Sequence, residues 1–216
     1  QREVQKLVEQ LNTPGQHALL YGERGVGKSS LAKIATDLLL RHLLAGAPFY
    51  LVRCDSSTTF ENVLDGPFVG AGGVRSPNET TTEKRASGGG GVTLGLFEGS
   101  GRFERTERNT RTSSVRDLSP REGAGVLEKY RGLLLVDEAD AMKRVVDKRR
   151  LAELIKLLSD AGSPFKVIVV GIAESGEDLT AAHPSVHRCL KETKLDRMTA
   201  IELTEIIKGA ARRLGL

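Results

Sequence analysis

Residues 22–29 read Gly-Glu-Arg-Gly-Val-Gly-Lys-Ser, a spacing of residue types suited to holding phosphate groups. The glycines let the backbone curl so that successive N–H groups point at phosphate oxygens. The ammonium of Lys28 suits the β- and γ-phosphates, and the hydroxyl of Ser29 suits Mg²⁺. We therefore predict a nucleoside-triphosphate site. Its binding residues are Gly22, Glu23, Arg24, Gly25, Val26, Gly27, Lys28, Ser29 and Ser30.

A second group of candidate residues follows an apolar run at 133–140, Leu-Leu-Leu-Val-Asp-Glu-Ala-Asp. Four apolar residues in succession predict a buried strand of a parallel sheet. We expect Asp137, at its end, to hold Mg²⁺ through water, together with Ser29. We expect Glu138 to polarise the attacking water, with Lys28 as the catalytic cation. An acidic turn in solvent is the alternative, and the phosphate loop earlier in the chain disfavours it.

The elements around both motifs must bring them together. An apolar strand at 17–21 precedes the phosphate loop, and a helix at about 28–45 follows it, so the helix dipole favours anions at the loop. The pattern predicts further strands at 48–55, 132–137, 166–171 and 190–195. It predicts further helices at 1–12, 56–64 (capped by Ser57 or Thr58), 118–130, 147–161 and 199–214 (capped by Thr199). This alternation indicates an α/β fold, a parallel β-sheet with helices on both faces.

Residues 66–125 differ from the rest in composition. They contain a run of four glycines at 88–91, and two short alternating segments, 92–97 and 102–108, flank a glycine turn. We predict a flexible insertion with a hairpin. Its arginines at 102, 105, 108 and 111 are candidates for phosphate contacts, and a solvated hairpin remains the alternative. The predicted organisation is a core at 1–195 that carries this insertion, followed at 196–216 by the first helix of a truncated lid.

Composition narrows the functional class only slightly. The net charge of +4 and pI of about 9.1 allow contact with nucleic acid without requiring it. Two distant cysteines, Cys54 and Cys189, are expected to be reduced thiols, which points to the cytoplasm. We find no apolar stretch of membrane-spanning length. Since the chain begins with Gln1 and its last helix stops at Leu216, we expect a piece of a longer protein.

Three local matches resemble the AAA+ ATPases, chiefly the clamp-loader and origin-recognition branch with its transposition and defence relatives. They are the phosphate loop with the following Ser-Leu, Val136-Asp-Glu-Ala-Asp140, and Ser185-Val-His-Arg-Cys189. The resemblance implies binding and Mg²⁺-dependent hydrolysis of ATP. It also implies that Arg188 is an arginine finger that reaches the nucleotide of a neighbouring subunit. The chain would then work as a homo-oligomer, either a ring or a filament, and would act on DNA or a nucleoprotein complex.

The resemblance has gaps and leaves an alternative open. The residue that positions water before the finger motif is either Glu174 or Ser175, and His187 stands where the clamp-loader motif has serine. The second sensor arginine has no counterpart that we can assign. The alternative function is a nucleotide-gated signalling or defence module, similar to STAND ATPases, that controls an effector outside this chain. Nucleic acid and other protein subunits are partners that both functions allow.

Overall fold

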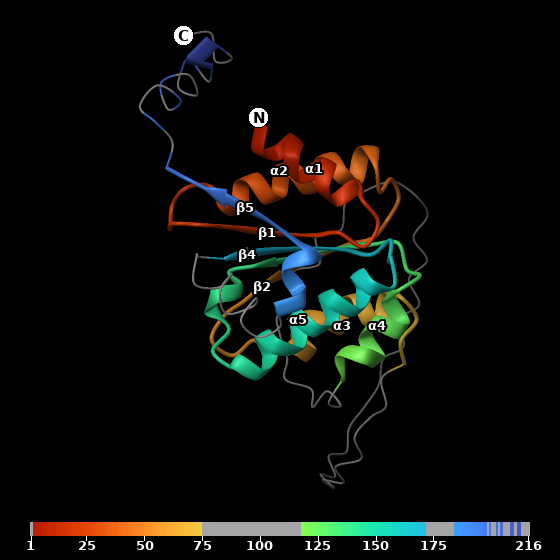
Figure 1. Ribbon diagram of the computed structural model, residues 1–216. Coiled ribbons are helices and arrows are strands. Elements are labelled where there is room, and N and C mark those ends of the chain that lie inside the picture. Colours follow the sequence, from red (N-terminus) through yellow and green to blue (C-terminus); the bar gives the residue numbers. More distant parts are fainter. Residues whose placement is uncertain are drawn as a thin grey trace, which may run out of the picture. The chain divides into compact units, whose positions relative to one another are not determined.

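A computed structural model gives a five-stranded parallel sheet. It describes residues 2–74, 118–171 and 184–197, together with Thr199, Glu202, Thr204, Lys208, Gly209, Ala211 and Arg212. The strands are β1 (His17–Gly22), β2 (Phe49–Arg53), β3 (Leu133–Asp137), β4 (Lys166–Gly171) and β5 (Leu190–Leu195). Their order is β2-β3-β4-β1-β5, and every pair is parallel (Figure 1). The predicted α/β fold is confirmed.

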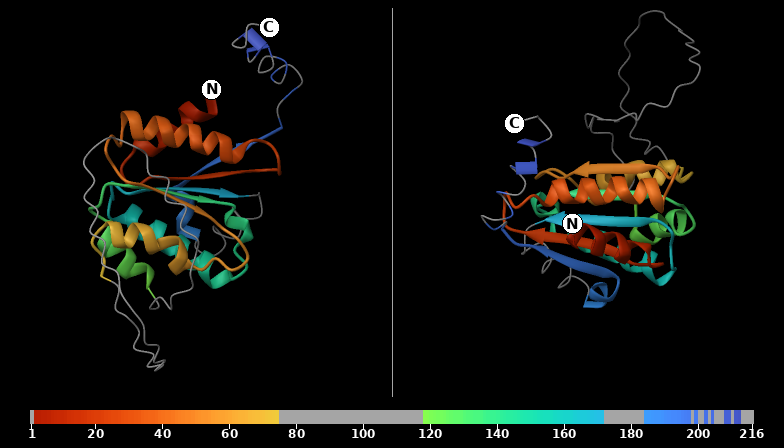
Figure 2. Two further views of the ribbon diagram at one scale, coloured as in Figure 1. Left: turned by 180° about the vertical axis from the view of Figure 1, so that it is seen from behind. Right: turned by 90° about the horizontal axis from the view of Figure 1, so that it is seen from above.

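Helices cover both faces of this sheet. On one face lie α1 (Arg2–Asn12) and α2 (Lys28–His42), and on the other lie α3 (Phe60–Gly70), α4 (Pro120–Leu127) and α5 (Val145–Asp160) (Figures 1 and 2). Side chains alternate along each strand, so β3 contributes to two cores. Leu133 and Leu135 pack with α1 and α2, whereas Leu134 and Val136 pack with the other three helices. All of β3 is buried, which explains its continuous apolar run.

The start of α3 differs from the sequence-based expectation. Thr59 is the N-cap: its hydroxyl accepts from the Asn62 N–H at 3.4 Å, while Asn62 Oδ1 accepts from the Thr59 N–H at 3.0 Å. The predicted cap at Ser57 or Thr58 is therefore wrong. Those side chains turn back to Asp55, whose Oδ1 accepts from the Ser57 N–H at 2.8 Å and from Thr58 Oγ1 at 3.0 Å.

Both ends of the predicted insertion are helical. α3 continues to Gly70, and α4 begins at Pro120 behind a capping box of Ser119 and Glu122. The predicted hairpin and its four arginines lie outside the described residues, as do Glu174 and Ser175. The insertion thus stays a prediction, while the regular core extends further into 66–125 than the sequence suggested.

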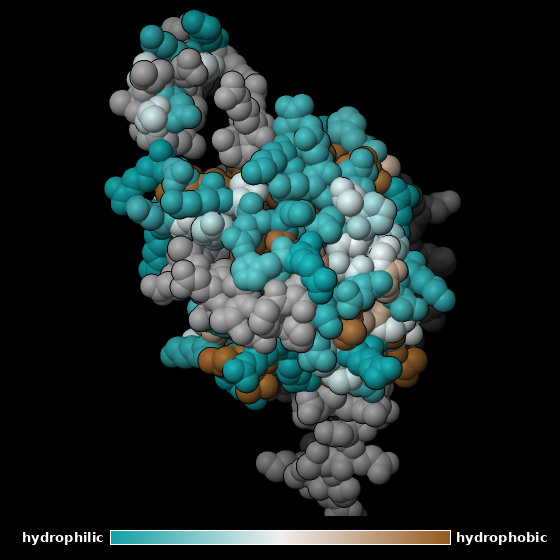
Figure 3. Space-filling model, viewed as in Figure 1, coloured by the Kyte–Doolittle hydropathy of each residue, from teal (hydrophilic) through white to brown (hydrophobic). Residues whose placement is uncertain are grey.

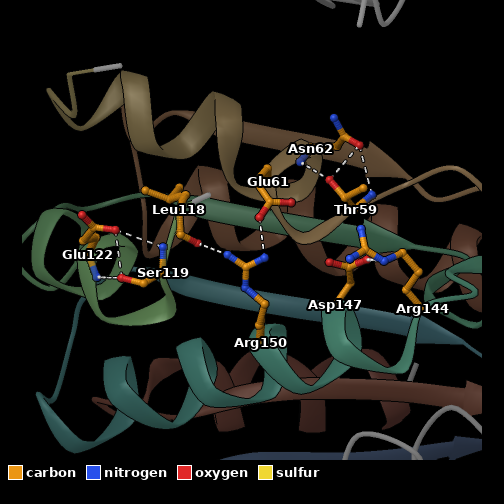
Figure 4. A network of polar contacts seen from close by, with 9 residues as sticks. All are labelled: Thr59, Glu61, Asn62, Leu118, Ser119, Glu122, Arg144, Asp147 and Arg150. Carbon is orange, nitrogen blue, oxygen red and sulfur yellow. Dashed lines mark hydrogen bonds and ion pairs between the residues drawn. The ribbon is translucent and has the colours of Figure 1, made fainter. Parts of the chain in front are cut away.

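Arg150 of α5 ties together the three helices of the lower layer (Figure 4). Its guanidinium forms an ion pair with Glu61 of α3 and donates to the Leu118 carbonyl at 2.5 Å, just before α4. It also lies 4.7 Å from the centre of the Phe60 ring, within cation–π range. One side chain of α5 therefore holds both the first turn of α3 and the segment just before α4.

Two smaller expectations are confirmed. Cys54 and Cys189 are both buried, and neither forms a disulfide. Thr199 caps the last segment, because its hydroxyl accepts from the Glu202 N–H at 3.3 Å and Glu202 Oε2 accepts from the Thr199 N–H at 2.7 Å. In the described part of the chain, no helix has both the length and the apolar character needed to cross a membrane.

Candidate active site

The phosphate loop joins the carboxyl end of β1 to the start of α2. Three of its residues must be glycine because of backbone conformation or a close backbone contact. A Cβ on Gly22 would lie 2.2 Å from the Leu195 carbonyl oxygen, so β1 and β5 could not pair as closely with any other residue here. Gly25 has φ 83° and Gly27, the N-cap of α2, has φ 92°. These left-handed conformations favour glycine. Val26 between them is buried in the core beneath α2, which anchors the loop.

The phosphate loop and the acidic motif meet through one hydrogen bond. Ser29 Oγ donates to Asp137 Oδ1 at 2.9 Å, although the two residues are 108 positions apart in sequence. Asp137 is only 4% exposed, and its Oδ1 also accepts from the Glu138 N–H at 3.1 Å. A hydroxyl and a carboxylate oxygen at the same point are the ligands that Mg²⁺ takes when phosphates and waters supply the rest. The residues present therefore fit the predicted metal.

Glu138 has an unusual backbone conformation. Its φ of 57° makes it the only non-glycine residue with positive φ in the described chain. The left-handed conformation is unfavourable for glutamate and tends to persist at functional positions that the surrounding structure holds in place. It directs the chain away from the end of β3 and leaves the Glu138 side chain exposed beside the buried Asp137.

The side chain of Lys28 folds back over the phosphate loop. Its Nζ donates to the carbonyl oxygens of Gly22 at 3.0 Å and Glu23 at 2.7 Å. The charge is therefore held in place by the loop's own backbone, at the N-terminal end of α2. Arg24 and Ser30, also predicted to bind nucleotide, are exposed.

Arg197 belongs to this region, and the sequence reasoning missed it. Its Nε lies 2.6 Å from Glu23 Oε2, which links the segment after β5 to the second residue of the phosphate loop. The available signal was position: a cation two residues beyond the last strand of a parallel sheet lies at the edge where all strands end. Both side chains are largely exposed, so the pair is solvent-screened.

Arg188 lies at the opposite edge of the sheet. It ends the 3₁₀ helix η2 (Pro184–Arg188), and its carbonyl accepts from Gln16 Nε2 at 3.4 Å, just before β1 begins. β1 runs beside β5 from the pair His17 and Leu190 to the pair Gly22 and Leu195. At ~3.3 Å per residue, the strand separates Arg188 from the phosphate loop by about 17 Å. The structure thus does not bring this exposed arginine to the nucleotide site of its own chain.

Cys54 is next to the acidic motif without being a candidate nucleophile. Its N–H donates to the Asp137 carbonyl at 2.8 Å. Burial, and then the negative charges of Asp55 and Asp137, raise the pKa of its thiol to about 12. It is therefore a neutral packing residue near pH 7.

Fold and site together define a nucleotide-binding protein of the P-loop class. The family model described as "AAA domain" matches residues 12–177, well over half of the chain, which therefore belongs to this family. No curated protein matches the chain significantly.

Solved structures support the same fold. The ORC1 protein of Aeropyrum pernix in complex with DNA is similar over 98% of this chain and 49% of its own length, with 20% identity and a TM-score of 0.53. The ORC2 protein of the same organism, in ADPNP–ADP complexes, is similar over 98% and 51%, with 13% identity and a TM-score of 0.57. The chain thus spans about half the length of these proteins and shares their fold over that part.

Proposed function

We propose that this chain binds ATP with Mg²⁺ and hydrolyses it as part of an oligomer that acts on DNA or a nucleoprotein complex. The hydrogen bond between Ser29 and Asp137 carries the proposal, because it brings two motifs with distinct chemistry to one point. In an unrelated glycine turn, nothing would require an acidic residue from another strand to meet the loop's hydroxyl.

The residues have separate roles in this proposal. The loop N–H groups and Lys28 hold the phosphates, and charge neutralisation there favours transfer. Ser29 and Asp137 would hold Mg²⁺, which would supply positive charge to offset the negative charge of the phosphates. The exposed carboxylate of Glu138 accepts a hydrogen bond from the attacking water and orients it.

The binding partners are proposed from proteins of similar structure. One is an ORC1 protein in complex with DNA, and another is an ORC2 protein with ADPNP and ADP. The resemblance in motifs suggests that DNA and further copies of this chain are the partners here too. Two buried cysteines that form no disulfide support a cytoplasmic site of action.

Glu138→Gln tests the hydrolytic part of the proposal. The amide keeps the size of the side chain but cannot act as a base, so we expect ATP to bind with unchanged affinity and turnover to fall ~100-fold or more. Phosphate release and a fluorescent-ATP titration measure the two effects separately.

Asp140→Asn is the matched control. This carboxylate lies two residues further along, in the 3₁₀ helix η1 (Ala139–Ala141), and its neutralisation should leave turnover within about twofold. Wild-type turnover in Glu138→Gln would contradict the assigned role, and loss of ATP binding in both variants would indicate a structural effect.

A further inference from the structure

The N-terminal end of α5 carries exposed positive charge that the proposed ATP site does not use. Residues 143–149 read Lys-Arg-Val-Val-Asp-Lys-Arg. Lys143, Arg144 and Arg149 are all exposed, and we refer to these three as the α5 basic patch. The one acid of the segment, Asp147, is 0% exposed, and Arg144 Nε lies 3.4 Å from its carboxylate (Figure 4). The surface of this segment is therefore positive.

Local helix stability does not explain these charges. The N-terminal end of a helix carries partial positive charge, so cations are unfavourable there. α2 shows the favourable placement, with Arg41 and His42 in its last turn. α5 has no basic residue in its last turn, and a segment with one acid, Asp147, and several cations where it begins. An anionic ligand would offset both the side-chain charges and the helix dipole.

The geometry of the patch suits a phosphate backbone more than a peptide. Val145 and Val146, which begin α5, are 58% and 55% exposed. Figure 3, in the view of Figure 1, shows hydrophobic side chains among strongly hydrophilic ones at this end of the helix, at the lower left. These are two adjacent exposed side chains at the start of a helix, whereas an amphipathic peptide needs a groove for its apolar side chains. Phosphates require only cations that project toward them.

The patch is also close in sequence to the proposed catalytic base. Glu138 is followed by η1, then by Met142, which is 1% exposed, and then by Lys143. Only the short turn η1 and the buried Met142 separate Lys143 from Glu138, so a ligand that displaces Lys143 would also shift the backbone of the residue that would orient water. Contact at the patch can therefore alter hydrolysis as well as binding.

We propose that the α5 basic patch binds the phosphate backbone of duplex DNA and that this contact stimulates ATP hydrolysis. The inference rests on the proposed function and names the DNA-binding surface of that function. The proposed contact is to phosphates, which carry no sequence information, so it is independent of base sequence.

The test compares two charge reversals of equal size. Lys143→Glu with Arg149→Glu changes the patch, and Lys33→Glu with Lys129→Glu is the control at two exposed cations on α2 and after α4. Arg144 is left unchanged because it pairs with buried Asp147. Binding of a fluorescein-labelled duplex is measured by anisotropy with ATP and Mg²⁺, over a series of salt concentrations.

We expect the patch variant to bind at least ~10-fold more weakly than the control, with the slope of log K against log salt reduced by ~2. DNA stimulation of hydrolysis should be lost, while hydrolysis without DNA stays at the wild-type rate. Lys143→Gln with Arg149→Gln should also weaken DNA binding, by a smaller factor. This milder variant keeps the test valid if the charge-reversed variant misfolds. Val145→Gln with Val146→Gln should bind DNA within about twofold of wild type.

Each contrary result has a distinct meaning. If wild type binds DNA and the patch variant matches the control, the patch is overturned while the proposed function stands. If the valine variant loses binding and the charge variant keeps it, the surface is an apolar protein-docking site and the proposal is wrong. If wild type binds no duplex at all, the DNA part of the proposed function fails together with the patch.

Discussion

At the scale of single residues, His17 shows how burial fixes a protonation state. The side chain is fully buried at the start of β1, and its Nδ1 accepts from the Val167 N–H at 3.2 Å, while Nε2 has no hydrogen-bond partner. Nearby, Lys166 Nζ donates to the Thr13 carbonyl at 2.7 Å. Burial, and then the charge of Lys166, lower the pKa of His17 to about 3. The imidazole is therefore neutral in the folded chain.

This neutrality predicts acid sensitivity. Below the ordinary pKa of 6.5 the unfolded histidine binds a proton and the folded one does not, until about pH 3. The free energy of unfolding should therefore fall by ~1.4 kcal/mol per pH unit over this window from His17 alone. Urea denaturation between pH 7 and 5 measures it, with His17→Asn as a non-titrating control whose Oδ1 can still accept from Val167. Equal pH slopes in both proteins would show that His17 does not contribute.

Residue types in the phosphate loop and acidic motif were predictable because their chemistry fixes their spacing. The hydrogen bond from Ser29 to Asp137 could be expected from the motifs, and it is present. The left-handed φ of Glu138 could not, since glutamate has no intrinsic preference for it. Arg197 was missed for a similar reason: its position after the last strand indicates its place at this edge of the sheet, but its ion pair with Glu23 spans 174 positions and no local pattern indicates that partner.

At the scale of elements, strands and helices mostly lie where hydrophobic periodicity places them, and the exception has a long-range cause. Thr58 is followed three residues later by Glu61, a pattern typical of a capping box. Yet α3 starts after Thr59, because Glu61 pairs with Arg150 of α5 and Asn62 supplies the reciprocal bond instead. Arg150, 89 positions away, thus determines where α3 begins. Rules that consider only neighbouring residues cannot predict such an effect.

The link between β5 and the phosphate loop gives a second prediction. Because Glu23 accepts from Lys28 through its carbonyl and pairs with Arg197 through its carboxylate, we expect Arg197 to preorganise the loop. Arg197→Gln should weaken ADP binding ~2- to 5-fold, with the free energy of unfolding changed by less than ~1 kcal/mol, as for exposed pairs.

A double-mutant cycle with Glu23→Gln isolates that pair. Both single variants should weaken binding, and the double variant should be no weaker than either one. Lys33→Gln, which removes an exposed charge from α2 outside the loop, is the control and should leave ADP binding unchanged. Fully additive effects of Glu23→Gln and Arg197→Gln would mean that the two side chains act independently on the nucleotide.

At the scale of the whole molecule, the sheet separates the two groups of charged residues that the motifs identify. The order β2-β3-β4-β1-β5 places the ends of β1 and β3 at one edge, which brings the phosphate loop to Asp137. The same parallel pairing of β1 with β5 places Arg188 at the other edge. Strand order depends on crossovers between distant segments, so the sequence alone could not establish this separation.

Because of this separation, substitution of Arg188 tests whether hydrolysis requires an oligomer. Since Arg188 is about 17 Å of strand away from its own phosphate loop, it can act only on the nucleotide of another chain. Arg188→Ala should bind ATP within about twofold of wild type and lose turnover ~100-fold or more. Wild-type specific activity should rise with protein concentration, as expected when the active site forms between two copies.

Mixing two inactive variants provides the decisive measurement. Lys28→Ala lacks the phosphate-binding cation and keeps Arg188, whereas Arg188→Ala has the reverse defect. Some interfaces of the mixture combine an intact loop with an intact arginine, so turnover should recover in part, and Arg188→Ala mixed with Glu138→Gln should recover likewise. His187→Ala, which changes the exposed neighbour of Arg188, is the control and should keep its turnover. If Arg188→Ala alone hydrolyses ATP like wild type at concentrations where oligomers form, the arginine is a surface charge and hydrolysis needs no second copy of it.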